Sequence, residues 1–159
     1  MKKILSILIL NLVLICSVYA STHNSNQIIE LDKLFNKLGK IDNVEEADIL
    51  EKEIWAVWNK HPKKKKLTDK LEFGTKLMYQ GRYDYALMVF SNIIKNDPKW
   101  SEAWNKRATL LFFMKDYQKS LSDIEKVLNL EPRHFGALSG RAQIYIELEL
   151  YQKAIKDLK

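Results

Sequence analysis

Cysteine, histidine, proline and glycine are all scarce in this chain. It has one cysteine, three histidines, three prolines and five glycines in 159 residues. The single cysteine, Cys16, excludes an intramolecular disulfide and a cysteine-based metal site. His23, His61 and His134 are far apart and provide no helical pair that could hold a metal ion. We therefore expect no bound metal and no cofactor.

Sequence signatures of catalysis are also missing. No G-x-S-x-G nucleophile elbow and no phosphate-binding glycine loop occurs. Acidic residues are plentiful, but most follow the polar faces of amphipathic segments. The stretch Arg133-His134-Phe135 could suggest a site, but we interpret it as a turn with Phe135 packed inward. The sequence predicts a protein that is not an enzyme.

The first twenty residues have the pattern of a secretory signal peptide. Lys2 and Lys3 precede an apolar run from Ile4 to Cys16, and small or tolerated residues lead up to Ala20. An uncleaved membrane anchor is the alternative, but a spanning helix needs about 20 apolar residues. We predict that residues 1–20 are a signal peptide, that cleavage occurs near Ala20 and that the protein is exported.

The charge of the chain argues against a nucleic-acid partner. The formal net charge is +6, and this includes Lys2 and Lys3, which leave with the signal peptide. The excess of basic residues that remains is too small to indicate nucleic-acid binding. It supports at most a weak contact with an anionic membrane surface.

Residues 21–62 are predicted to form a helical hairpin after a polar start. Apolar residues with helical spacing begin at Ile28 and stop before Gly39, which is a suitable helix end. Asn43 can cap a second helix, whose apolar stripe continues to Trp58.

The hairpin is followed by a break. Pro62 disfavours a helical conformation at His61, and the four lysines at 63–66 repel one another. We interpret 63–66 as a basic, solvated linker. A basic docking tag is the functional alternative.

From Leu67 onward the chain repeats itself with a period of about 34 residues, the length of one helix-turn-helix unit of a solenoid. Several independent columns share this period, and two of them hold small residues that let paired helices approach closely. The pattern predicts an all-α fold, a right-handed solenoid of stacked units preceded by the hairpin. The columns are Gly74, Ala108 and Ala142; Tyr83, Tyr117 and Tyr151; Ala86, Ser120 and Ala154; Phe90, Ile124 and Leu158; Ile93 and Val127; and Pro98 and Pro132.

The repeat divides 67–159 into units 67–100, 101–134 and 135–159. The third unit is shorter than a full period. This leaves three possibilities open: the chain is a fragment, its last helix is short and frayed, or a partner covers the exposed end.

These columns resemble the tetratricopeptide repeat family, and 67–159 is expected to be a tetratricopeptide repeat domain. In the middle unit its signature places hold Trp104, Ala108, Leu111, Tyr117, Ile124, Val127 and Pro132. The pattern departs from the family at three places, where Lys70 and Leu138 stand for an aromatic residue and Ser120 stands for alanine. These changes weaken packing but do not exclude the fold.

Four further segments resemble a group of exported alphaproteobacterial repeat proteins. They are L-D-K-L-F at 31–35, E-I-W-A-V-W at 53–58, W-N-K-R-A-T at 104–109 and P-R-H-F-G-A-L at 132–138. This resemblance implies a periplasmic location and stacked helical hairpins, and it implies no defined chemistry.

In this family the first helices of the units line a concave groove, which is where we expect a protein or peptide partner to bind. For Phe112, Phe113 and Ile146, ordinary packing between units is an equally good explanation. Family members that hold a peptide carboxylate use Lys and Asn at set positions; only Asn105 and Lys106 come near, at shifted places, so we reject that specificity. The predicted groove residues are Thr75, Met78, Tyr79, Asn105, Thr109, Phe112, Phe113, Ser139, Gly140, Gln143 and Ile146.

Gly136 and Gly140 are four residues apart in one predicted helix and should share a face. One hypothesis is that they allow a partner backbone to approach closely. The alternative is that Gly136 only starts the helix and that Gly140 is tolerated.

The sequence thus favours a scaffold or adaptor that binds a protein or peptide in the cell envelope. The alternative is a structural subunit of an envelope assembly.

Overall fold

The computed structural model describes residues 26–158, and all the regular structure in that range is helical. The predicted signal peptide and its cleavage site lie outside the described residues. The chain divides into two compact units between Lys64 and Lys65, and each is described by itself. Within 26–158, no helix combines the length and the apolar character needed to cross a membrane.

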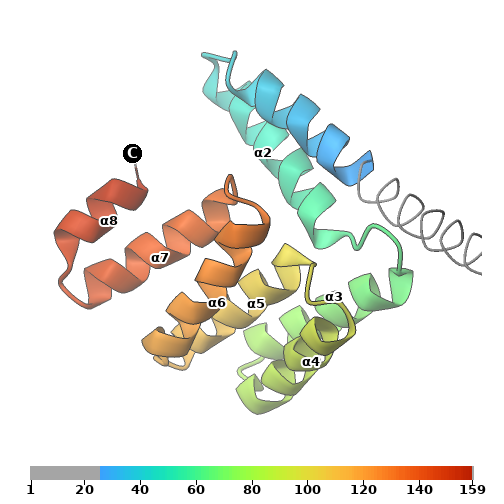
Figure 1. Ribbon diagram of the computed structural model, residues 1–159, viewed down its shortest axis with the longest axis vertical. Coiled ribbons are helices and arrows are strands. Elements are labelled where there is room, and N and C mark those ends of the chain that lie inside the picture. The colour runs from blue at the N-terminus through green and yellow to red at the C-terminus, as the bar shows by residue number, and fades with distance from the viewer. Residues whose placement is uncertain (1–25, 159) are drawn as a thin grey trace, which may run out of the picture. The chain divides into compact units, whose positions relative to one another are not determined.

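The N-terminal unit contains a helical hairpin, as predicted. Its helices are residues 26–38 and α2 (Val44–Asn59), which lie side by side in Figure 1. Gln27 Nε2 donates to Val57 O at 2.8 Å and to Lys60 O at 3.0 Å, so the first helix satisfies carbonyl groups at the end of the second. The rings of Phe35 and Trp58 pack with their centroids 5.9 Å apart.

Both predicted ends of this hairpin loop are confirmed. The first helix stops at residue 38, directly before Gly39. The Asn43 side chain accepts hydrogen bonds from Glu45 N at 2.8 Å and from Glu46 N at 3.2 Å, and so caps α2.

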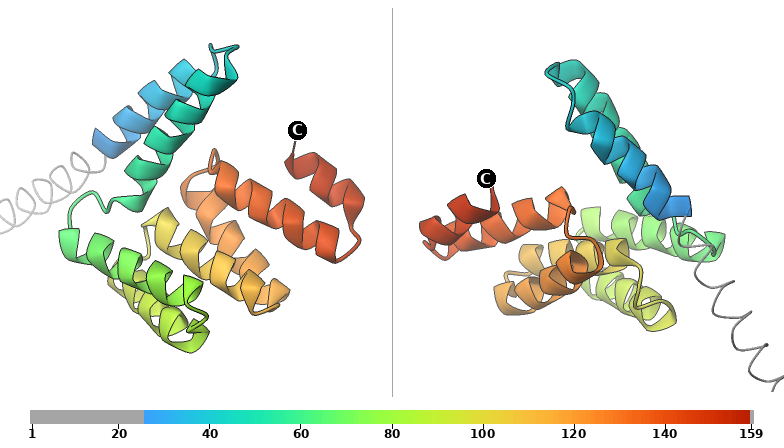
Figure 2. Two further views of the ribbon diagram at one scale, coloured as in Figure 1. Left: turned by 180° about the vertical axis from the view of Figure 1, so that it is seen from behind. Right: turned by 45° about the horizontal axis from the view of Figure 1, so that its top comes forward.

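The second unit is a solenoid of three helix pairs, and Figures 1 and 2 show the pairs following one another. Within each pair the two helices contact each other, and α5 also contacts both α3 and α7. The first helices of the units therefore stack in sequence, as in a tetratricopeptide solenoid. The helices are α3 (Lys65–Tyr79), α4 (Tyr83–Asn96), α5 (Ser101–Phe113), α6 (Tyr117–Leu130), α7 (Phe135–Glu147) and α8 (Tyr151–Asp157).

The structure places the start of α3 earlier than the sequence suggested. Lys65 and Lys66, which were expected in the linker, form its first turn. Lys65 Nζ lies 2.7 Å from Asp69 Oδ1, one turn further on. This pairing of opposite charges at i and i+4 offsets the repulsion between neighbouring lysines.

The small-residue columns permit close helix packing. Gly74 and Ala108 are buried where paired helices meet, and so are Ala86 and Ser120 opposite them. A Cβ atom added to Gly74 would lie 2.6 Å from Phe90 Cε1, closer than real contacts allow. At this position only glycine fits the observed separation between α3 and α4.

The turn inside each unit has the same backbone geometry. Gly81, Lys115 and Glu149, which occupy the same place in successive units, have positive φ angles of 73°, 59° and 59°. In each turn the following N–H closes the first helix, as Asp116 N does by donating to Leu111 O at 2.9 Å. Only the first turn uses glycine, so the other two hold side chains in a left-handed conformation.

An arginine–aspartate pair repeats in the second and third units. Arg107 donates to both carboxylate oxygens of Asp123 at 2.7 and 2.8 Å. Arg141 does the same with Asp157 at 2.7 and 2.6 Å, and this hydrogen bonding raises the pKa of the arginine despite its partial burial. Each pair joins the two helices of one unit. Arg107 also donates to Ser91 Oγ at 3.1 Å and so reaches the preceding unit.

Candidate functional site

A pocket of about 240 Å³ opens where α5, α6 and α7 meet. Its wall and floor come from two successive units, because α5 and α6 belong to one unit and α7 begins the next. None of the lining residues carries a charged side chain. They are Asn105, Ala108, Thr109, Phe112, Phe113, Ser120, Ile124, Gly136, Ala137, Ser139, Gly140 and Gln143.

Seven of the residues predicted for the groove line this pocket. They come from two first helices that are one repeat period apart in the sequence, so the repeat register alone brings them together. We call this pocket and its rim the groove pocket. The seven are Asn105, Thr109, Phe112, Phe113, Ser139, Gly140 and Gln143.

The other four predicted groove residues lie elsewhere. Met78 was expected on the groove, but it is only 3% exposed and belongs to the core cluster of α3, α4 and α5, so that prediction is wrong. Tyr79 and Ile146 are exposed at helix ends, and neither lines the groove pocket. The Thr75 hydroxyl donates to Leu71 O at 2.8 Å within its own helix.

Aromatic side chains form one side of the groove pocket. The rings of Phe112 and Phe113 meet edge to face with centroids 6.1 Å apart. Phe112 also packs against Tyr117 at 5.7 Å, so it is partly a core residue, as the alternative interpretation held. Phe113 stacks on Tyr83 but remains 43% exposed, which leaves it accessible to a partner.

A buried polar cluster lies next to the groove pocket. Glu102 in the first turn of α5 and His134 at the N-cap of α7 are both fully buried. His134 Nδ1 accepts the Ala137 N–H at 3.2 Å, so the ring proton lies on Nε2. Nε2 then donates to Glu102 Oε2 across 3.0 Å.

The same carboxylate engages two further residues. Asn105 Nδ2 donates to Glu102 Oε2 at 3.1 Å, and Lys106 Nζ lies 2.9 Å from Glu102 Oε1. Burial is the strongest single influence on Glu102 and by itself would raise its pKa. The interactions with His134 and Lys106 together outweigh burial, so the pKa of Glu102 lies below its ordinary value.

Sequence reasoning missed this cluster. Acidic residues were assigned to solvent faces, whereas Glu102 is inaccessible, and His134 rather than Phe135 is the fully buried side chain of that turn. The one available signal was the repeat register, which places His134 at the same position as the buried Trp100. Because Glu102 and His134 cannot be reached from solvent, their arrangement is structural.

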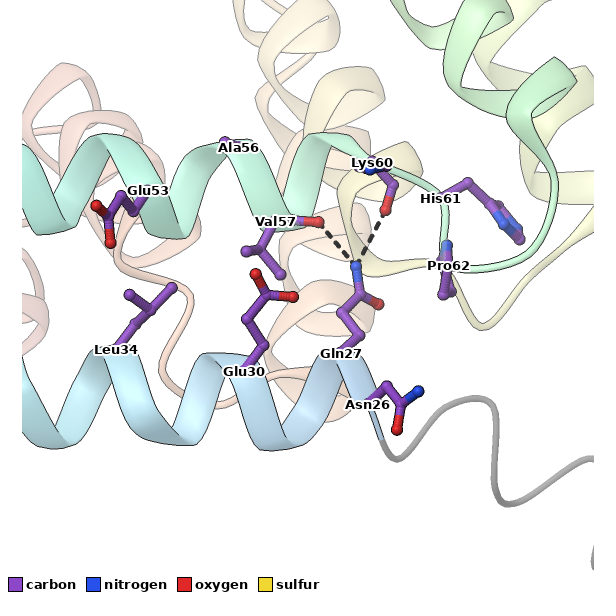
Figure 3. Close-up of a pocket in the computed structure, with 10 residues that line it drawn as sticks. All are labelled: Asn26, Gln27, Glu30, Leu34, Glu53, Ala56, Val57, Lys60, His61 and Pro62. Atoms are coloured by element: carbon purple, nitrogen blue, oxygen red, sulfur yellow. Dashed lines mark hydrogen bonds between the residues drawn. The ribbon is translucent and has the colours of Figure 1, made fainter.

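A second pocket, of about 450 Å³, lies in the N-terminal unit and was not predicted (Figure 3). Gln27 and Glu30 point from the first helix toward α2, and the lining also includes two charged residues, Glu53 of α2 and Lys60 directly after it. The His61 Nδ1 atom is occupied, because it accepts the N–H groups of Lys63 and Lys64 at 3.1 and 3.0 Å. These lining residues do not form a catalytic arrangement.

No three histidine, cysteine or carboxylate side chains come together as a possible metal site in the part of the chain that the structure describes.

Comparison with known proteins bears on the solenoid unit. The sequence model of the tetratricopeptide repeat family matches residues 101–134. A TPR repeat-containing protein of Rhizobium etli is 41% identical over 90 residues, which cover 57% of this chain and 44% of that protein. The chain therefore spans less than half the length of this alphaproteobacterial relative.

Solved structures give the same fold. The first TPR of Spaghetti (RPAP3), bound to the HSP90 peptide SRMEEVD, has a TM-score of 0.56 and 27% identity, covering 58% of this chain and 74% of that one. A tetratricopeptide repeat protein from Parabacteroides merdae has a TM-score of 0.54 and 26% identity, covering 80% and 50%. The repeat columns, the stacked helix pairs and these matches agree that α3 to α8 form a solenoid of stacked helix-turn-helix units with the tetratricopeptide repeat fold, and residues 101–134 match the family's sequence model.

Proposed function

We propose that this protein is a scaffold or adaptor that binds a protein or an extended peptide, and that it is not an enzyme. One observation carries the proposal: the first helices α5 and α7 present a pocket with an accessible phenyl ring and several amide and hydroxyl groups. Rigid aromatic anchors surrounded by polar groups are typical of peptide-binding surfaces. The similar RPAP3 domain, bound to an HSP90 peptide, supports the same use of the fold here.

We further propose that the scaffold works in the cell envelope, after export and cleavage near Ala20. The support is the pattern of residues 1–20: two lysines, an apolar run too short to span a bilayer, and a cleavage motif. The modest net charge supports neither a nucleic-acid partner nor more than weak membrane contact. Osmotic-shock fractionation tests the location, and N-terminal sequencing should find Ser21 first.

Photo-crosslinking in cells tests the binding function. A photoreactive amino acid replaces Phe113 in one variant and Lys126, an exposed residue of α6 outside the groove pocket, in the control. We expect one protein to be captured from position 113 and not from position 126. Equal capture from both positions, or none from either, would contradict binding in the groove.

A structural subunit of an envelope assembly is the second candidate. One observation favours it: Tyr151 and Ile155 on α8, and Leu158 directly after it, are exposed, whereas their counterparts Tyr117, Leu121 and Ile124 belong to or pack against a core cluster that includes residues of α7. Sedimentation velocity separates the candidates. A monomer at micromolar concentration supports the adaptor, and an obligate oligomer supports the assembly subunit.

A further inference from the structure

Two glycines of α7 line the groove pocket at positions where the preceding unit has large side chains. In the repeat register, Gly136 and Gly140 of α7 correspond to Glu102 and Lys106 of α5. In α5 those two side chains form an ion pair of 2.9 Å, with Glu102 fully buried and Lys106 mostly so. In α7 the same two positions are glycine, and both glycines line the groove pocket.

Gly140 has free space on its side-chain side. A Cβ atom built there would have Ile124 Cδ1, at 3.9 Å, as its nearest neighbour, which is an ordinary contact. At Gly74, by contrast, a Cβ atom would collide with the Phe90 ring. Gly74 is therefore explained by helix packing within the chain, whereas Gly140 borders open volume.

The size and chemistry of the pocket define what it can hold. Its volume of about 240 Å³ is smaller than the roughly 300–1,000 Å³ of pockets for drug-sized ligands, and it suits a single side chain. Phenyl rings, Ile124 and backbone at the glycines offer an apolar surface. Asn105 donates one N–H of its side-chain amide to Glu102, and the amide also carries a second N–H and the acceptor Oδ1.

The groove pocket offers no opposite charge to an acidic side chain of a ligand. No lining residue is cationic, and Lys106, which adjoins the lining residue Asn105 in sequence, lies against the Glu102 carboxylate. An ionised group moved into such a site would lose hydration without gaining an opposite charge. The chain therefore differs in chemistry from a site for an acidic peptide such as SRMEEVD, the ligand of the similar RPAP3 domain.

We propose that the groove pocket receives one large uncharged side chain, aromatic or long aliphatic, from an extended peptide partner. Phe112 and Phe113 contact this side chain, and the glycine face of α7 leaves room for it. The inference rests on the proposed peptide-binding function and names the residue class that anchors the peptide.

Selection from a random peptide phage-display library against the purified protein tests the inference. We expect enriched peptides to share one aromatic or long aliphatic residue with uncharged neighbours. Replacing that residue by alanine should weaken binding, measured by fluorescence anisotropy, by at least about tenfold. Peptides with an acidic anchor in its place would overturn the proposal.

Graded substitutions at Gly140 give the second readout. Gly140→Leu fills the pocket and should weaken binding by at least about tenfold, whereas Gly140→Ala adds one methyl group and should change it by less than about threefold. Ser139→Phe covers the pocket mouth from an exposed position and serves if Gly140→Leu does not fold. Circular dichroism and thermal melting check each variant.

The outcomes separate the two proposals. Peptides that bind equally well to wild type, Gly140→Leu and Ser139→Phe would overturn the pocket but leave peptide binding intact. A strong loss of binding in Gly140→Ala would indicate close approach of a peptide backbone and would also overturn the side-chain pocket. If no peptide is enriched, both proposals fail.

Discussion

His134 Nε2 donates to Glu102 Oε2 across 3.0 Å, and neither side chain is accessible to solvent. The pair joins the first turn of α5 to the N-cap of α7, the two helices that border the groove pocket. Since His134 uses its other ring nitrogen to cap α7, one imidazole both orients the helix and fixes it to its neighbour. The groove pocket therefore lies between helices that are held together by a buried polar contact.

The Glu102 carboxylate should make the free energy of unfolding depend on pH in the acidic range. Glu102→Gln keeps the shape of the side chain and should lower the free energy of unfolding at pH 7 by about 1–3 kcal/mol. Because the pKa of Glu102 in the fold lies below its ordinary value of 4.5, this contribution is complete above pH 4.5 and is lost as pH falls through the lowered pKa.

Urea unfolding at several pH values measures the effect. Wild type and Glu102→Gln should differ at pH 7 and converge in acid, and the exposed Glu53→Gln serves as control. A difference between wild type and Glu102→Gln that stays constant down to strong acid would show that ionisation of Glu102 contributes nothing.

The same substitution should have opposite effects at two helical glycines. Gly74→Ala forces a methyl group against the buried Phe90 ring and should cost about 1–3 kcal/mol of unfolding free energy. Gly140→Ala meets no close atom and should stabilise the fold by up to about 1 kcal/mol through helix propensity. Thermal unfolding of both variants is the measurement. Stabilisation by Gly74→Ala would contradict the tight packing of α3 on α4.

Lys115 has a φ of 59° at the turn where the first unit has Gly81. Lys115→Gly should relieve this left-handed strain and stabilise the fold by about 0.5–1 kcal/mol, less than the full strain because glycine also gains freedom when unfolded. Lys115→Ala keeps the strain and is the matched control. If both variants unfold at the same urea concentration, the turn is not strained.

The Arg107–Asp123 pair should depend on the two-pronged geometry of arginine. Asp123→Asn removes the charge from a nearly inaccessible carboxylate and should cost about 1.5–3 kcal/mol. Arg107→Lys should not preserve the interaction, because an ammonium group lacks the planar pair of parallel N–H donors that matches the two carboxylate oxygens. A double-mutant cycle with Arg107→Ala and Asp123→Asn measures the coupling. If the losses of unfolding free energy in the two single variants add up to the loss in the double variant, the pair contributes no coupling energy.

The repeat period was enough to predict the solenoid core. Phe90, Ile93 and Ile124 belong to repeat columns, and all three are buried as their columns require. The period predicts burial because equivalent positions in successive units pack against equivalent helices and therefore need similar residue types. It also identified the first helices, and hence seven residues that line the groove pocket.

What the period could not predict is pairing across helices. Glu102 in α5 and His134 at the N-cap of α7 are 32 residues apart. The amphipathic pattern of one helix does not show which side chain of another helix will pair with it. Met78 failed for a similar reason, because it occupies a groove position of the repeat but packs into the core with Leu110. The register gives a position on a helix, and the neighbouring side chains then decide whether that position is open.

Binding between α5 and α7 is tested most directly by mapping amide chemical shifts. The ¹⁵N-labelled protein is titrated with the partner segment that is captured from position 113. We predict that the shifted amides concentrate at residues 105–113 and 136–143, and that the Gly140→Leu variant loses these shifts. Shifts that concentrate on α8 or on the N-terminal hairpin, with none at the groove pocket, would contradict the proposed function.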